Sequence, residues 1–177
     1  MGYQTDFDGS FTITPPLPPE RVAYLQKFNE TRRMKRDATR AETIKDPIRE
    51  AVGLPIGPEG AYFVGGRDFR GQEADFSVIN QNTPPAGQPD LWCKWIVSDD
   101  GQDLLWDGGE KFYNYVQWLD YLNDHFFKPW GHVLDGEIFW SGEDDQDQGV
   151  IRARNGEIRA ACAAISHPEW DQMEPDV

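Results

Sequence analysis

Residues 110–127 read EKFYNYVQWLDYLNDHFF and residues 150–161 read VIRARNGEIRAA, and these two stretches decide the fold. In the first, apolar residues recur at the i, i+3, i+4 spacing of a helix with one buried face. The second places two short strands on either side of Asn155-Gly156, a dipeptide that supplies the positive φ of a tight hairpin turn. The helical stripe consists of Phe112, Tyr115, Val116, Leu119, Leu122 and Phe126.

Other turn and helix signals extend this pattern toward the N-terminus. Asp8-Gly9, Asp100-Gly101 and Asp135-Gly136 each predict a tight turn between short strands. Pro18-Pro19-Glu20 predicts the start of a helix that ends near Arg36. A shorter helix is predicted at 47–52, after the N-cap residue Asp46, and residues 65–90 read as a long loop.

This order of elements predicts an α+β fold, an antiparallel sheet with two main helices packed on it. A ferredoxin-like core with an extra C-terminal hairpin is one arrangement that fits. The 177 residues match one domain, so residues 1–177 are expected to form a single unit with a flexible tail at 167–177. Residues 7–13 also echo residues 134–140, and two hairpins with the same Asp-Gly turn would explain this without duplication.

Composition bounds the function more than any motif does. The net charge is −14, and residues 99–147 alone contribute 11 net negative charges. Because phosphate neutralisation dominates nucleic-acid affinity, this balance argues against DNA or RNA binding and leaves room for a basic protein partner. Of the 23 Phe, Trp and Tyr residues, 13 lie within residues 92–140, which indicates a dense aromatic core.

The predicted location is the cytoplasm, with no membrane segment. No apolar run approaches the 18 or so residues of a spanning helix, and the first residues lack the charged and apolar parts of a signal peptide. Cys93 and Cys162 are far apart and have apolar or small neighbours, so both are predicted to be buried free thiols.

Several segments resemble a family of small acidic, uncharacterised proteins of bacteria and their phages. The resemblance spans nearly the whole chain and implies one integral domain. The family carries no assigned activity, so the resemblance brings no catalytic residue to this sequence. The segments that carry it are residues 31–37, 51–55, 57–66, 84–89, 106–112 and 140–145.

Two sets of side chains are candidates for partner binding. Trp118 and Tyr121 fall on the flank of the helical stripe, so they are expected to be exposed anchors, because Trp and Tyr dominate binding hot spots. The acidic loop at 142–149 contributes Glu143, Asp144, Asp145 and Asp147. Clustered carboxylates also suit Ca²⁺, but the loop does not fit the EF-hand pattern, and a solvated connecting loop is the favoured interpretation.

A basic patch supports a different kind of site. Arg32, Arg33, Lys35 and Arg36 form the only dense basic run, and residues 20–50 carry a net charge of +3. With the glycine-rich loop 57–72, this patch could bind phosphate or another anion. The alternative is that these side chains pair with groups of the protein itself. The loop lacks the spacing of known phosphate-binding motifs.

The absence of catalytic motifs favours a non-enzymatic protein without a cofactor. No GxSxG, CxxC or HExxH motif occurs, and the three histidines His125, His132 and His167 lack further ligands for zinc. The leading hypothesis is a binding module that acts through a protein partner, for example as an inhibitor, an immunity protein or a phage anti-defence protein. The alternatives are a small-molecule or phosphate-binding protein or enzyme, and a structural component that self-assembles; the oligomeric state stays open.

Overall fold

A six-stranded antiparallel sheet is the largest element of the computed structural model, which describes residues 2–66 and 70–163. The strand order is β4-β5-β1-β6-β7-β8. The chain is therefore α+β, as predicted. The strands are β1 (Thr5–Thr14), β4 (Trp95–Val97), β5 (Asp103–Trp106), β6 (Val133–Gly142), β7 (Gln148–Arg154) and β8 (Glu157–Cys162).

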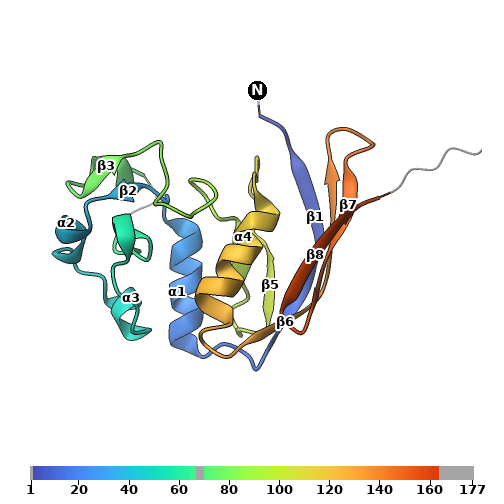
Figure 1. The fold of residues 1–177 in the computed structure, drawn as a ribbon, viewed down its shortest axis with the longest axis horizontal. Coiled ribbons are helices and arrows are strands. Elements are labelled where there is room, and N and C mark those ends of the chain that lie inside the picture. The colour runs from blue at the N-terminus through green and yellow to red at the C-terminus, as the bar shows by residue number, and fades with distance from the viewer. Residues whose placement is uncertain (1, 67–69, 164–177) are drawn as a thin grey trace, which may run out of the picture.

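Two helices lie on the same face of this sheet (Figure 1). The first is α1 (Pro19–Glu30), which ends six residues before the predicted boundary because Thr31 adopts an extended conformation. The second is α4 (Tyr115–Leu122), which continues as a π-helical turn over Asn123–Phe127. The predicted start near residue 110 is wrong, because Lys111 and Asn114 have positive φ and keep residues 110–114 out of the helix.

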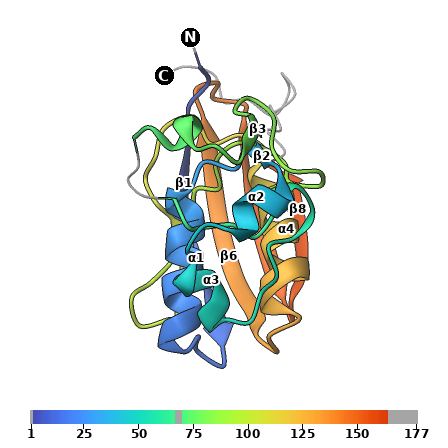
Figure 2. The same ribbon diagram turned by 90° about the vertical axis from the view of Figure 1, so that its left-hand side faces the viewer.

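Residues 31–66 and 70–90, here called the cap, form a third layer in front of α1 and α4 (Figure 2). The cap contains short elements separated by loops, and two of them, β2 and β3, pair in a small second sheet. The helix predicted at 47–52 is α3. The elements are β2 (Lys35–Arg36), α2 (Ala38–Glu42), α3 (Pro47–Ala51), the 3-10 turns η1 (Pro58–Gly60) and η2 (Gln72–Ala74), and β3 (Val78–Asn80).

The core lies between the sheet and the two helices and is rich in aromatic rings. Phe7 of β1 packs edge-on against the rings of Trp95, Trp106, Phe112 and Tyr115, with centroid distances of 4.8–5.8 Å. Such edge-to-face pairs are each worth about 0.5–1.5 kcal/mol beyond area burial. Much of the aromatic content noted in the sequence thus lies in the core.

The strongest departure from the sequence prediction lies in the middle of the sheet. Asp8-Gly9 and Asp135-Gly136 are not turns: they lie inside the long strands β1 and β6, which pair along their whole length. A Cβ on Gly9 would lie 2.5 Å from the carbonyl oxygen of Glu137, and one on Gly136 would lie 2.7 Å from that of Ser10. Glycine is needed here for close approach of the two backbones.

The echo between residues 7–13 and 134–140 has the same origin. Phe7 pairs with Trp140 and Ile13 pairs with Leu134, so the two similar segments are antiparallel neighbours. The interpretation as two separate hairpins is therefore wrong.

The C-terminal hairpin is confirmed, with Asn155-Gly156 as the two-residue turn between β7 and β8. Asp100-Gly101 likewise lies in the turn between β4 and β5. Cys93 is a buried free thiol, but Cys162 is exposed, because β8 is an edge strand of the sheet. The predicted tail at 167–177 and His167 lie outside the described residues.

Candidate functional site

The predicted aromatic anchors are not on the surface. Trp118 is 0 % exposed and Tyr121 is 7 % exposed, so the expectation that they are exposed is wrong. Both rings contact Phe28 of α1, and the Tyr121 hydroxyl accepts a hydrogen bond from Gln88 of the cap at 2.9 Å. Helix α1 and the cap therefore cover the flank of α4 that the sequence pattern predicts to be exposed.

Arg33, one of the predicted anion-binding residues, is a buried residue of the cap that contacts other cap segments and α1. Its guanidinium donates to the carbonyl oxygens of Ala61 at 2.6 Å and Phe63 at 2.7 Å, and to Gln88 Oε1 at 3.2 Å. The same group stacks on the Phe28 ring at 4.1 Å. Burial lowers the pKa of Arg33, and nearby Tyr24 partly opposes this shift. All of these partners are groups of the protein itself.

The rest of the basic patch is divided among three locations. Arg32 donates to the Gln81 carbonyl and to Asn82, and Lys35 forms an ion pair with Glu59 at 3.1 Å. Arg36 turns inward toward Asp75 and Ser77. The four side chains are thus not gathered around a common ligand position.

The acidic loop between β6 and β7 holds the N-terminal segment. Asp147 accepts hydrogen bonds from the Tyr3 hydroxyl at 2.8 Å and from Trp140 Nε1 at 3.1 Å. Glu143 accepts from the Gln4 backbone N–H at 2.7 Å, and Asp144 accepts from the Gln146 backbone N–H. The Asp145 carboxylate has no partner among the described residues. Two of the four loop carboxylates therefore fasten the N-terminal segment to the loop.

No group of three or more metal-ligating side chains forms within residues 2–66 and 70–163. His125 stacks on Tyr121 at 4.1 Å and contacts the Tyr62 hydroxyl, and burial lowers its pKa. His132 lies between the Pro15 carbonyl and Arg21. Both histidines are engaged with neighbouring protein groups.

The surface that stands out is the sheet face opposite α1 and α4, here called the open face. Alternation in β1, β6 and β7 sends one set of side chains into the core and the other outward. No described helix covers this outer side (Figure 1). The outward residues include Asp6, Asp8, Ser10 and Thr12 of β1, Asp103 of β5, Asp135, Glu137, Phe139 and Ser141 of β6, Val150, Arg152 and Arg154 of β7, and Glu157, Arg159 and Ala161 of β8.

Cross-strand register arranges these residues in rows across the open face. One row begins at Asp8 of β1 and continues with three apolar residues on the next strands, Phe139, Val150 and Ala161. Phe139 is 51 % exposed, unusually high for a large apolar ring in the middle of a sheet. The next row is charged and includes Glu137, Arg152 and Arg159 as direct neighbours.

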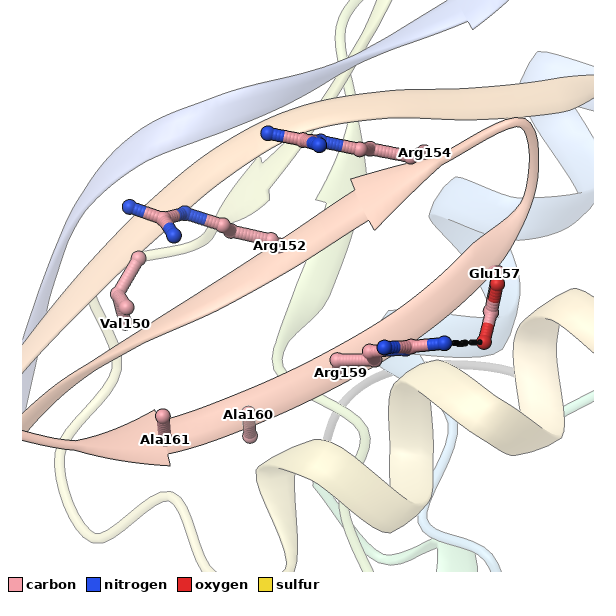
Figure 3. Close-up of a pocket in the computed structure, with 7 residues that line it drawn as sticks. All are labelled: Val150, Arg152, Arg154, Glu157, Arg159, Ala160 and Ala161. Atoms are coloured by element: carbon pink, nitrogen blue, oxygen red, sulfur yellow. Dashed lines mark hydrogen bonds and ion pairs between the residues drawn. The ribbon is translucent and has the colours of Figure 1, made fainter.

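The arginines border a pocket of about 560 Å³ on the β7–β8 hairpin (Figure 3). Arg152 and Arg159 lie directly opposite each other, an arrangement that is unfavourable for like charges unless each is compensated. Each has a glutamate partner, Glu137 at 2.6 Å and Glu157 at 2.7 Å. Arg154 has no ion pair with a described residue.

The open face was not predicted from the sequence. The alternating pattern of residues 148–161 was visible, but the sequence does not say which face of the strands a helix covers. Phe139, Arg152, Arg154 and Arg159 therefore looked like ordinary strand residues.

No protein-family model, curated protein or solved structure matches this chain. Within the described residues, no helix is both long and apolar enough to cross a membrane.

Proposed function

We propose that this chain is a non-enzymatic binding module that holds a basic protein partner on the open face of its sheet. The observation that carries the proposal is Phe139, a half-exposed aromatic ring on a sheet surface that no described element covers. Aromatic rings are enriched at the centres of interfaces, where they become fully buried on binding.

The size of the open face is adequate for such an interface. Strands β1 and β6 are ten residues long. With a rise of about 3.3 Å per residue and strand spacing of about 4.8 Å, β1, β6 and the shorter strands β7 and β8 present roughly 500 Å². Standard interfaces bury about 800 Å² per partner, so these four strands would form the greater part of such an interface.

The charges on the open face favour a basic partner. Four of its carboxylates, those of Asp6, Asp8, Asp103 and Asp135, form no ion pair with a described residue, whereas Arg154 is the one such arginine. Complementary charge steers association and suppresses wrong partners more than it adds affinity. The partner is expected to present Lys or Arg toward β1 and β6 and an acidic side chain toward Arg154.

The topology supports a finer description of the same module. We infer that β1, α1, β4, β5, α4 and β6 constitute a ferredoxin-like core extended by the β7–β8 hairpin. The order β4-β5-β1-β6, with α1 and α4 on one face, supports this inference. In such a layered arrangement the second sheet face is free for binding. Inhibition, immunity or anti-defence would be specific uses of this face.

The test compares partner capture by three forms of the tagged chain: wild type, Phe139→Ser and Phe76→Ser. Phe76 is 59 % exposed but lies in the cap, so Phe76→Ser removes a similar exposed ring from a different surface. A basic protein that is retained by wild type and by Phe76→Ser, lost by Phe139→Ser and released by high salt supports the proposal.

Two outcomes would overturn it. Equal capture by Phe139→Ser and wild type would show that the open face is not the binding surface. Light scattering that shows a wild-type dimer, dissociated by Phe139→Ser, would assign the face to a second copy of this chain instead of a different protein.

A further inference from the structure

A second pocket lies in the cap, away from the open face. Its volume is about 630 Å³, within the usual range for small-molecule sites. The segment that follows α2 contributes Lys45, and glycines contribute the backbone on two sides, at Gly65-Gly66 and Gly71. Glycine lets a ligand approach the backbone closely because no Cβ intervenes.

The lining of this cap pocket is cationic in a strongly acidic protein. Arg36, Lys45 and Arg70 line it, and the one carboxylate among its described lining residues is that of Asp75. Asp75 is already engaged by Arg36 Nη1 at 3.4 Å and by the Ser77 hydroxyl at 2.6 Å. Lys45 and Arg70 form no ion pair with a described residue. The charge left over on the described lining is positive and suits an anion.

Arg36 gives a second, independent reason to expect a ligand. Its side chain is 2 % exposed, and its guanidinium stacks on the Phe63 ring at 4.1 Å. Nη1 donates to the Ser77 hydroxyl at 2.8 Å, but the buried Nη2 has no hydrogen-bond partner among the described residues. A buried donor without an acceptor is unfavourable, and a small shift of the Arg36 guanidinium toward the pocket that this residue lines would let a bound anion supply the acceptor.

We propose that this cap pocket binds the phosphate group of a small organic phosphate. Arg36 supplies the unpaired Nη2 donor of its planar guanidinium, and Lys45 and Arg70 supply further positive charge at the rim. The pocket is larger than one phosphate group, which leaves volume for the organic part. This site is independent of protein binding on the open face, since the two surfaces share no lining residue.

Calorimetric titration with adenosine 5′-monophosphate, inorganic phosphate and adenosine tests the proposal. Adenosine 5′-monophosphate is expected to bind, inorganic phosphate to bind or compete, and adenosine to leave the heat signal flat. The double variant Lys45→Gln/Arg70→Gln is expected to weaken phosphate binding at least about tenfold. Neither side chain has a described ion pair, so the fold is expected to persist, and a thermal melt verifies this.

Lys111→Gln is the matched control, because Lys111 is exposed and lines neither pocket. The proposal is overturned if neither phosphate probe binds, if adenosine binds as tightly as its monophosphate, or if Lys111→Gln weakens binding as much as the double variant. The last result would show that general charge, not the cap pocket, attracts the anion.

Discussion

Replacing Arg33 by methionine tests whether the basic patch at 32–36 is structural. Methionine keeps an unbranched side chain over Phe28 but removes every donor. The Ala61 carbonyl keeps a second hydrogen bond, from Gln88 Nε2 at 2.7 Å, whereas Phe63 loses the donor that lies 2.7 Å from its carbonyl oxygen. Arg33→Met is therefore expected to loosen the contact between the 60–63 segment and α1.

The size of the effect follows from these contacts. A hydrogen bond from a charged donor contributes about 1.5–3 kcal/mol, and stacking of a guanidinium on a ring adds about 0.5–2 kcal/mol. Relief of the desolvation of Arg33 offsets part of this loss. We expect a net decrease of about 3 kcal/mol in the free energy of unfolding, which corresponds to roughly 10 °C in Tm for a chain of this size.

Urea unfolding followed by tryptophan fluorescence measures the change, with Arg32→Met as the control. The Arg32 side chain donates only to exposed groups, so its replacement is expected to cost about 0.5 kcal/mol. The reasoning is refuted if Arg33→Met lowers the free energy of unfolding by no more than Arg32→Met does.

Three further predictions concern the central strands, the thiols and the acidic loop. Gly9→Ala is expected to lower the free energy of unfolding by about 3 kcal/mol in the same urea assay. The control is Gly71→Ala, which is expected to lower it by about 1 kcal/mol, because Gly71 also has a positive φ but no atom lies within 4 Å of its added Cβ. Burial raises the pKa of the Cys93 thiol to about 12, so at pH 8 Ellman's reagent should titrate Cys162 alone in the folded protein and both thiols after denaturation. Because this pKa lies above the ordinary value of 9.0, the neutral Cys93 thiol contributes stability below pH 9, and that contribution is lost as the pH rises toward 12. Rapid labelling of Cys93 at pH 8 would contradict its burial. Asp147→Ala should cost about 2 kcal/mol in thermal melts, because Tyr3 and Trp140 lose their acceptor, whereas Asp145→Ala should change stability by less than about 0.5 kcal/mol. Equal melting temperatures for those two variants would refute the role given to Asp147.

Local signals predicted the parts of the fold that depend on local chemistry. The β7–β8 hairpin follows from Asn155-Gly156, because a two-residue turn is specified by its own residues. The same reasoning failed at Asp8-Gly9 and Asp135-Gly136. There the neighbouring strand requires the glycine, because its carbonyl oxygen would lie 2.5–2.7 Å from an added Cβ. That strand is far away in the sequence, so no local pattern reports it.

The candidate sites failed for a related reason. Trp118 and Tyr121 lie on the flank of the apolar stripe, which would be exposed if α4 packed against the sheet alone. Instead α1 and the cap cover that flank through Phe28 and Gln88. Burial of a helix depends on how many layers surround it. The spacing of apolar residues along the helix mainly indicates the face that packs on the sheet, not the faces that other layers cover.

Side-chain footprinting of the captured complex by hydroxyl radicals tests the central claim most directly. The free protein exposes Phe139 on the open face and Phe76 and Ile79 on the cap to similar extents, 51 %, 59 % and 60 %. If the partner binds the open face, oxidation of Phe139 falls on complex formation while that of Phe76 and Ile79 stays constant. Protection of Phe76 and Ile79 with unchanged oxidation of Phe139 would contradict the account.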